Sequence, residues 1–477
     1  MKLKRIALGL ALIGSSWGAA AAAAPNPGAR VSDERERKSV SVTVYNQNFG
    51  LVREVRELQG LPVGQWPLEF RDVAATIQPE TVAVKTNGGG ASLRVLEQNY
   101  RYDLLTPETL LEKYVGRKVR AYRYHEATGK EDVVDAQLLS VQGSPILQIG
   151  SEITFNYPGR LAFAELPPNL IAKPTLVWLV DNQAPQQSLE VSYLAGGLSW
   201  VADYVLILDE SEKRAGLTGW VSLTNNSGAS YRNAALKLVA GDVNRVREDV
   251  PQATNGGAMR LTAKQAEFRE EGLLEYHMYT LGRPTDLLDK ESKQVTLLEA
   301  SGLGIEKKFV FSSQGYYYQS QYDRRVPNEK VSVYLHFQNS TENGLGMPLP
   351  KGTLRVYKAD KSSAKQFVGE DTIDHTPRDE KVKLKLGEAF DVVAHRKQVN
   401  WSSLGNCSSE STWEIELRNH KDEAITVEVR EPVGGDWNIV NSSHPALRDD
   451  AHNFHFDVSV PKRGQTQLSY RVRVRWC

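Results

Sequence analysis

Residues 468–476 read LSYRVRVRW, and this run near the end of the chain is the clearest indication of the fold. Every second position is apolar: Leu468, Tyr470, Val472, Val474 and Trp476 alternate with Ser469, Arg471, Arg473 and Arg475. Successive side chains of a strand point to opposite faces of its sheet. The run therefore predicts a strand with one face in a core and the other in water.

The same alternation recurs through the chain. It is found in the runs 40–44, 331–337, 382–386, 413–417, 425–429 and 454–460. Repeated short strands separated by turns are typical of sandwiches of two antiparallel sheets. We therefore expect a mainly β, multi-domain protein with antiparallel, Ig-like β-sandwich domains.

One helix start interrupts the strands. Thr106, Pro107 and Glu108 supply a capping side chain, a proline at the first helical position and an acid in the first turn. Closely spaced strands follow, which favours a small SH3-like barrel inserted into the first β domain. The expected order is 1–23 signal peptide, 38–105 β domain, 106–165 barrel-like insertion, 166–247 β-sandwich, 248–272 linker or mobile loop, 273–395 β-sandwich and 396–477 Ig-like β-sandwich.

Composition excludes several classes of protein. The 477 residues include 58 basic and 58 acidic side chains, so the formal net charge is zero and gives no electrostatic argument for a nucleic-acid partner. With 40% hydrophobic and 24% charged residues, the chain has the composition of a folded protein rather than a disordered one or a helical membrane protein.

The N-terminus resembles a secretory signal peptide. Lys2, Lys4 and Arg5 precede the apolar run 6–14, and the small-residue tract 19–24 follows. We expect cleavage after Ala23, a periplasmic or secreted protein, and no integral membrane segment after cleavage. The two cysteines, Cys407 and Cys477, are then a candidate disulfide, because exported proteins fold under oxidising conditions; two free thiols are the alternative.

Several ordered motifs resemble a known bacterial family. They are Ser199 to Tyr204, Leu217 to Val221, Asn225 to Gly228, Asn233 to Val243, Tyr279 to Leu281, Lys293 to Val295, Leu349 to Gly352 and Gly387 to Asp391. Together they are similar to the family catalogued as domain of unknown function 4139, from about residue 175 to the C-terminus. The resemblance implies an exported, mostly β protein and carries over no catalytic residues.

Candidate chemistry is sparse in the sequence. His452 and His455 near Asp449 and Asp450 form the best ligand-like cluster, but strand geometry does not bring three ligands together, so we expect no metal and no cofactor. Ser227 and Ser301 precede glycines in predicted turns rather than in a nucleophile elbow. We therefore name no catalytic residue.

Aromatic residues offer a binding hypothesis instead. Trp200, Tyr204 and Trp220 fall in adjacent predicted strands, where the two tryptophans are expected in a core. The tract Tyr316, Tyr317 and Tyr318 cannot place all three rings on one side of a strand, so it is a candidate interaction surface.

The sequence thus predicts a non-catalytic binding or structural protein of the cell envelope, with a protein or glycan of the envelope as partner. Two alternatives stay open, and they leave enzymatic activity undecided. An envelope hydrolase acting on glycan or peptide would gather Asp203, Asp242 or His277 in one pocket. A carbohydrate-binding protein would instead present a coplanar row of exposed aromatic rings.

Overall fold

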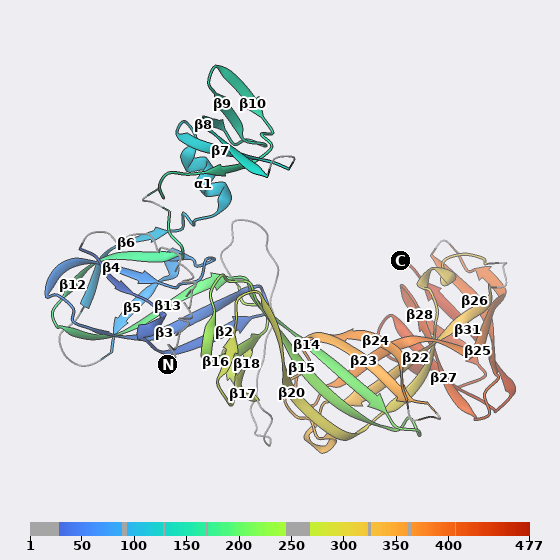
Figure 1. Cartoon of the computed structure of the whole chain (residues 1–477). Helices are drawn as coiled ribbons and strands as arrows, with labels where there is room; N and C mark the ends of the chain where they lie inside the picture. Colours follow the sequence, from blue (N-terminus) through green and yellow to red (C-terminus); the bar gives the residue numbers. More distant parts are fainter. Residues whose placement is uncertain are drawn as a thin grey trace, which may run out of the picture. The chain divides into compact units, whose positions relative to one another are not determined.

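The computed structural model describes residues 28–87, 93–126, 129–167, 170–244, 268–322, 326–360, 362, 364–405 and 407–477 (Figure 1). The expected signal peptide, 1–23, lies outside the described residues, as do residues 248–267 of the expected linker. Strands in several sheets dominate the described chain, which confirms the mainly β, multi-sheet prediction.

The chain forms two compact units. Unit 1 comprises the described residues up to Val40, Arg53–Ala195 and Ser227–Ala229. Unit 2 comprises Ser41–Val52, Gly196–Asn226 and the described residues from Ser230 to Cys477. The division falls within three strands: β2 (Arg37–Tyr45), β3 (Phe49–Gln59) and, at its last residue, β13 (Gln186–Gly196).

A four-stranded sheet in unit 1 follows the order β1-β4-β12-β6. Its strands are β1 (Arg30–Ser32), β4 (Gly64–Arg71), β12 (Thr175–Asn182) and β6 (Leu93–Arg101). β5 (Ala83–Thr86) pairs with β13 (Gln186–Gly196). Unit 1 also has two one-turn 3-10 helices, η1 (Glu34–Glu36) and η2 (Pro79–Thr81). The core includes Phe70 and Trp178, whose rings lie 5.0 Å apart, and the guanidinium of buried Arg56 stacks over Phe70.

A small domain lies between β6 and β12 in the sequence. It holds α1 (Pro107–Tyr114), β7 (Lys118–His125), β8 (Lys130–Ser140), β9 (Ile146–Ile149), β10 (Glu152–Phe155) and β11 (Arg160–Ala162). The Thr106 and Thr109 side chains cap α1 reciprocally, as the sequence predicts for a helix start here. The strands form an open antiparallel sheet in the order β10-β9-β8-β7-β11. Because β6 and β12 are hydrogen-bonded neighbours, the segment leaves one sheet and returns to it.

Unit 2 contains a five-stranded sheet in the order β20-β15-β14-β23-β24. Its strands are β14 (Leu198–Leu208), β15 (Arg214–Asn225), β20 (Glu291–Gly304), β23 (Gly352–Ala359) and β24 (Lys365–Ile373). β16 (Tyr231–Ala240) pairs in parallel with Ser41–Tyr45 of β2, and its other partners are β18 (Tyr276–Leu281) and β19 (Thr285–Leu287). β18 pairs with β17 (Phe268–Leu273), so residues 268–272, expected at the end of a linker, are strand.

The last sheet has nine strands in the order β28-β31-β26-β25-β22-β21-β27-β30-β29. They are β21 (Glu306–Ser312), β22 (Val326–Gln338), β25 (Lys381–Ser403), β26 (Ser408–Asn419), β27 (Ile425–Pro432), β28 (Asp436–Ser442), β29 (Leu447–Arg448), β30 (Asn453–Val460) and β31 (Gly464–Arg475); the 3-10 helices are η3 (Gly315–Tyr318) and η4 (Thr341–Asn343). Phe456 of β30 packs 5.1 Å from Tyr470 of β31, so the sheet folds back on itself like a sandwich.

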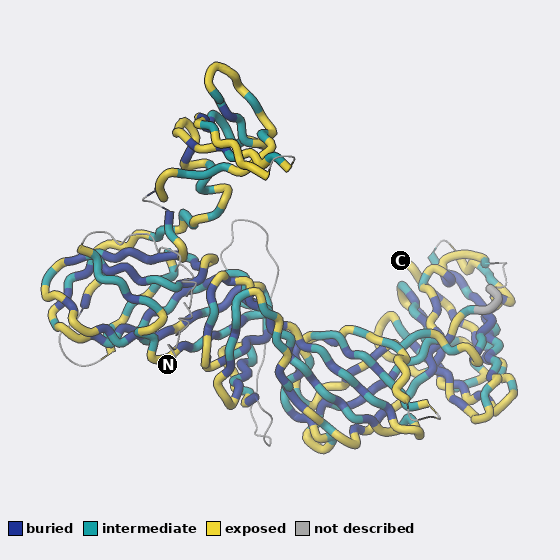
Figure 2. The backbone as a smooth tube through the Cα atoms, in the orientation of Figure 1, coloured by how far each residue is buried: buried dark blue, intermediate teal, exposed yellow. Residues whose placement is uncertain are grey.

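The strands alternate between buried and more exposed residues, which Figure 2 shows along the tube. In β31 the predicted inward residues from Leu468 to Val474 are buried, and the three arginines between and after them are exposed. Trp476 lies beyond the strand and is 37% exposed. β25 runs through residues 395 and 396, where we expected a domain boundary from the sequence.

Candidate functional site

The aromatic residues in the family-like motifs of unit 2 are mostly core residues that donate hydrogen bonds to backbone carbonyl oxygens. The indole N–H of Trp200 donates to the Val239 carbonyl oxygen at 3.2 Å. The hydroxyls of Tyr204 and Tyr279 donate to the carbonyl oxygens of Pro350 (2.8 Å) and Pro348 (3.0 Å). These hydrogen bonds bring residues distant in sequence into one core and fix the segment that leads into β23. Trp220, by contrast, is half-buried on the other face of β15.

The residues of the hydrolase alternative have separate partners. Asp203 accepts hydrogen bonds from Arg355 (3.0 Å) and Ser222 (2.9 Å) on neighbouring strands. His277 lies 2.8 Å from the Glu270 carboxylate across β17 and β18, and Asp242 is exposed after β16. The contacts of Asp203 and His277 are those of sheet-surface pairs. Asp242 and His277 both lie near enough to His375 to influence its pKa, which burial lowers from its ordinary value.

The remaining sequence candidates lie in turns or on sheet surfaces. Nδ1 of His455 is 2.8 Å from Asp449, while Asp450 accepts from the backbone N–H of His452, and no group of three metal-ligating side chains occurs in the described part of the chain. Ser227 is buried, with its hydroxyl 3.4 Å from the Ala229 carbonyl oxygen, and Ser301 is exposed in β20.

The tyrosine tract is divided between surface and core. Tyr316 is 54% exposed, whereas Tyr317 and Tyr318 are buried in the nine-stranded sandwich. The Tyr318 hydroxyl donates to Glu431 at 2.6 Å and lies 2.9 Å from the hydroxyl of Tyr470. Only Tyr316 is available at the surface, so the tract does not form the coplanar exposed row that a sugar-binding platform needs.

In the structure Cys407 and Cys477 form a disulfide whose Cα atoms are 5.6 Å apart. The bond joins the start of β26 to the end of the chain, next to the backbone hydrogen bond from Trp476 to Cys407. The sequence made these two cysteines a candidate disulfide, with two free thiols as the alternative.

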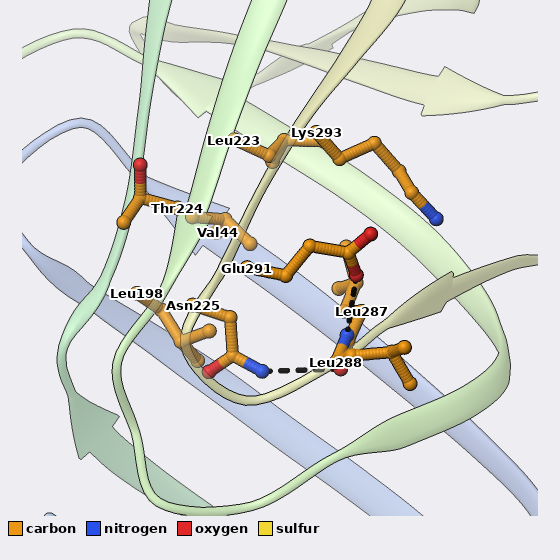
Figure 3. A pocket seen from close by; sticks show the side chains of 9 residues that line it. All are labelled: Val44, Leu198, Leu223, Thr224, Asn225, Leu287, Leu288, Glu291 and Lys293. Atoms are coloured by element: carbon orange, nitrogen blue, oxygen red, sulfur yellow. Dashed lines mark hydrogen bonds between the residues drawn. The ribbon is translucent and has the colours of Figure 1, made fainter.

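Figure 3 shows a small cavity between the ends of β14 and β15 and the turn before β20. The Asn225 side chain donates to the Leu287 carbonyl oxygen at 3.1 Å, and the Leu288 N–H donates to the Glu291 carboxylate at 3.2 Å. The cavity volume of about 10 Å³ is at the limit for a single water molecule. These residues therefore close a turn, which explains why asparagine suits position 225.

A larger apolar pocket in unit 2 was not anticipated from the sequence. It has a volume of about 210 Å³. Its buried floor comes from β14, β21, β22 and β25, with Leu208, Phe309, Leu335 and Val392. Three lysines and two carboxylates also line it: Lys307, Lys358, Lys421, Glu212 and Asp391.

Glu212 links two of the three lysines at this pocket, Lys307 and Lys358. The ammonium group of Lys358 donates to one oxygen of its carboxylate at 2.5 Å, and that of Lys307 donates to the other. The three side chains are about a quarter to a third exposed. Burial alone would raise the pKa of Glu212, but the two ammonium groups outweigh it and lower the pKa to about 2.

A tight turn between β14 and β15 positions the Glu212 carboxylate beside Lys307 and Lys358. Glu212 has φ of 58°, in the left-handed region that glutamate rarely adopts. The Asp209 carboxylate stabilises the turn by accepting from the backbone N–H groups of Lys213 (3.2 Å) and Arg214 (3.3 Å). An unfavourable backbone conformation is thus held at the point where the carboxylate meets the pocket.

Phe390 lies at the edge of this pocket and is 95% exposed. β22 pairs with β25 at Lys330↔Val393 and at Ser332↔Glu388, so residues 389–392 bulge out of the ladder with β22, while Val392 still pairs with Asn419 of β26. Bulges redirect side chains and often occur beside functional sites. Phe390 lies an even number of residues from Leu384 and Leu386, although Glu388 interrupts that apolar row, so strand periodicity alone would place this ring inward.

A second, more polar groove adjoins the apolar pocket. Its volume is about 830 Å³, and it shares Glu212, Lys307, Phe309 and Lys421 with the pocket. The groove is lined by six carboxylates and four ammonium groups: Glu210, Glu212, Glu306, Glu423, Glu428 and Asp457 with Lys213, Lys307, Lys308 and Lys421.

The sequence from residue 189 to 477 matches the family described as Domain of unknown function (DUF4139). The chain belongs to this family. This match confirms the resemblance seen in the sequence motifs. The apolar pocket, the polar groove and Phe390 all lie within the matched DUF4139 segment. No curated protein matches the chain. In the part of the chain that the structure describes, no helix has both the length and the apolar character required to cross a membrane.

Proposed function

We propose that this DUF4139 protein is an exported, non-catalytic binding component of the cell envelope, and that it contacts its partner at the edge of the apolar pocket in unit 2. The observation that carries the proposal is Phe390, an aromatic side chain 95% exposed on a bulge beside the pocket. Exposed aromatic residues next to apolar pockets are typical anchors of binding surfaces.

Two further observations support a location in the cell envelope. The basic, apolar and small-residue segments of the first 24 residues are typical of a secretory signal. The disulfide between Cys407 and Cys477 suits an oxidising compartment, where such bonds persist.

Cell fractionation tests the location. The tagged full chain should appear in the periplasm or medium with residues 1–23 removed, and a variant without residues 1–23 should stay in the cytosol. A full-length cytosolic product that keeps its first 23 residues would contradict export.

Site-specific photo-crosslinking tests the contact. A photoreactive phenylalanine analogue at position 390 should give a discrete adduct with an envelope protein, identified by mass spectrometry. The same analogue at Tyr124, which is 60% exposed in unit 1, serves as the control. No adduct at 390, or the same adduct at both positions, would refute the proposed contact.

A further inference from the structure

The apolar pocket has the size of one side chain. Small-molecule sites are usually about 300–1,000 Å³, whereas an engineered apolar cavity of about 150 Å³ holds a benzene ring. The volume of about 210 Å³ therefore suits one large aliphatic or aromatic group rather than a whole lipid or cofactor. Leu208, Phe309 and Leu335 supply the apolar floor.

Two ammonium groups that share one carboxylate can hold an anion beside that apolar group. The pocket's lining carries three ammonium groups and two carboxylates, and Glu423 of the polar groove also lies 3.9 Å from Lys307 and 3.6 Å from Lys421. Lys307 and Lys358 share the single carboxylate of Glu212, and each ammonium group has three N–H donors. Because these groups are partly buried, their interaction with an incoming carboxylate is screened less than at an open surface.

The adjoining groove is richer in carboxylates. Its lining has six carboxylates and four ammonium groups, of which Glu212, Lys307 and Lys421 also line the pocket, and it is about four times larger than the pocket. A ligand suited to both is apolar and anionic at one end and polar, with positive charge, along the rest. The free C-terminus of a polypeptide combines an apolar side chain with a carboxylate on the same residue, and capture of C-termini is a known mode of peptide recognition.

We propose that the apolar pocket and the polar groove together bind the C-terminal segment of a partner polypeptide. The apolar last side chain enters the pocket and its α-carboxylate binds Lys307 and Lys358. The preceding basic residues lie in the polar groove. This inference deepens the proposed function and rests on it for the role of the pocket edge. Phe390 lies where it covers the last residue of the bound chain.

Fluorescence anisotropy with the purified mature chain tests this assignment. The probe is a fluorescein-labelled hexapeptide of alternating glycine and lysine that ends in phenylalanine with a free carboxylate. The same peptide as a C-terminal amide should bind at least tenfold more weakly, because the amide has no charge for the two lysines. Equal affinity of the acid and the amide, or no binding of the acid, would overturn the inference.

Matched variants locate the binding site. Lys358→Gln should weaken binding of the free acid by about tenfold and leave the amide nearly unchanged. Lys365→Gln, at an exposed position of β24 outside both grooves, should bind like the unaltered protein. Val368→Asp, at the 41% exposed edge of the pocket, should also weaken the acid without unfolding the protein, as circular dichroism can verify. Equal affinities of all three variants would place the peptide elsewhere and refute the assignment.

The two proposals fail separately. If the hexapeptide does not bind but position 390 still forms a specific adduct, the C-terminal assignment is wrong and the partner-binding role stands. If the peptide binds as described but no adduct forms at 390, the envelope partner is refuted while the pocket's chemistry is supported.

Discussion

The hydroxyl of Tyr204 donates a 2.8 Å hydrogen bond to the carbonyl oxygen of Pro350, 146 residues further along the chain. Tyr204 is fully buried in β14, and Pro350 stands just before β23, the parallel neighbour of β14. The bond therefore fixes the entry of one strand beside another that is distant in sequence.

Tyr204→Phe should remove this bond and leave the Pro350 carbonyl without its donor. We expect a loss of about 1–3 kcal/mol in the free energy of unfolding, the usual cost of an unsatisfied buried polar group. Urea denaturation followed by tryptophan fluorescence measures it. Tyr102→Phe, at a 72% exposed position, is the control and should change little. Equal midpoints for the two variants would show that the bond contributes nothing.

Glu431→Gln should destabilise the C-terminal sandwich. Arg396 is buried, its guanidinium donates to the Glu431 carboxylate, and Tyr318 donates to the same carboxylate at 2.6 Å. Removing the negative charge leaves a buried guanidinium poorly compensated, which costs about 3–5 kcal/mol. The double variant Arg396→Met, Glu431→Gln should recover part of that loss in urea unfolding. A double variant less stable than Glu431→Gln would contradict this account.

Replacing both cysteines with serine should destabilise unit 2. The disulfide spans 70 residues, and in the chain-entropy model a loop of this length corresponds to about 4–5 kcal/mol. Reduction of the unaltered protein should lower the thermal midpoint in calorimetry by the same amount as the double substitution. A midpoint that is insensitive to reductant would refute the contribution.

Glu212→Gln should have a pH-dependent effect. The pKa of Glu212 falls from 4.5 to about 2 because of Lys307 and Lys358, so its carboxylate stabilises the fold above pH 4.5 and loses this effect as the pH falls toward 2. The variant should therefore be less stable than the unaltered protein at pH 7, with the difference narrowing below pH 4.5. Urea unfolding across this range measures it, with Glu299→Gln, at an exposed position of β20, as control. A difference independent of pH would contradict the ion pairs.

Replacement of two phenylalanines at the same pocket by alanine should change the free energy of unfolding by very different amounts. Phe390→Ala removes a ring that is 95% exposed, so the free energy of unfolding should change by no more than about 0.5 kcal/mol. Phe309→Ala empties a buried position and should cost about 3–5 kcal/mol. Thermal unfolding of both variants distinguishes a binding residue from a core residue. A large loss for Phe390→Ala would show that this ring has a structural role.

Local patterns sufficed for the strands and the helix start. The alternation in β26, β27, β30 and β31 predicts which faces are buried, because a strand's side chains alternate whatever its neighbours are. The capping residues before α1 likewise act within one turn. The tyrosine tract shows the limit of such reasoning, since its burial depends on η3 packing against Trp413 in β26 rather than on spacing along a strand.

The sequence by itself therefore determined the fold class, the alternating faces and the membership of the DUF4139 family, because these depend on neighbours in the chain or on motifs in a fixed order. Only the tertiary structure decided the lysine-lined pocket. Glu212 lies 95 residues from Lys307 and 146 from Lys358, and the Phe390 bulge depends on how β25 registers against β22. Period-two patterns do not encode which strands become neighbours or where a ladder is interrupted, and those two choices create the pocket.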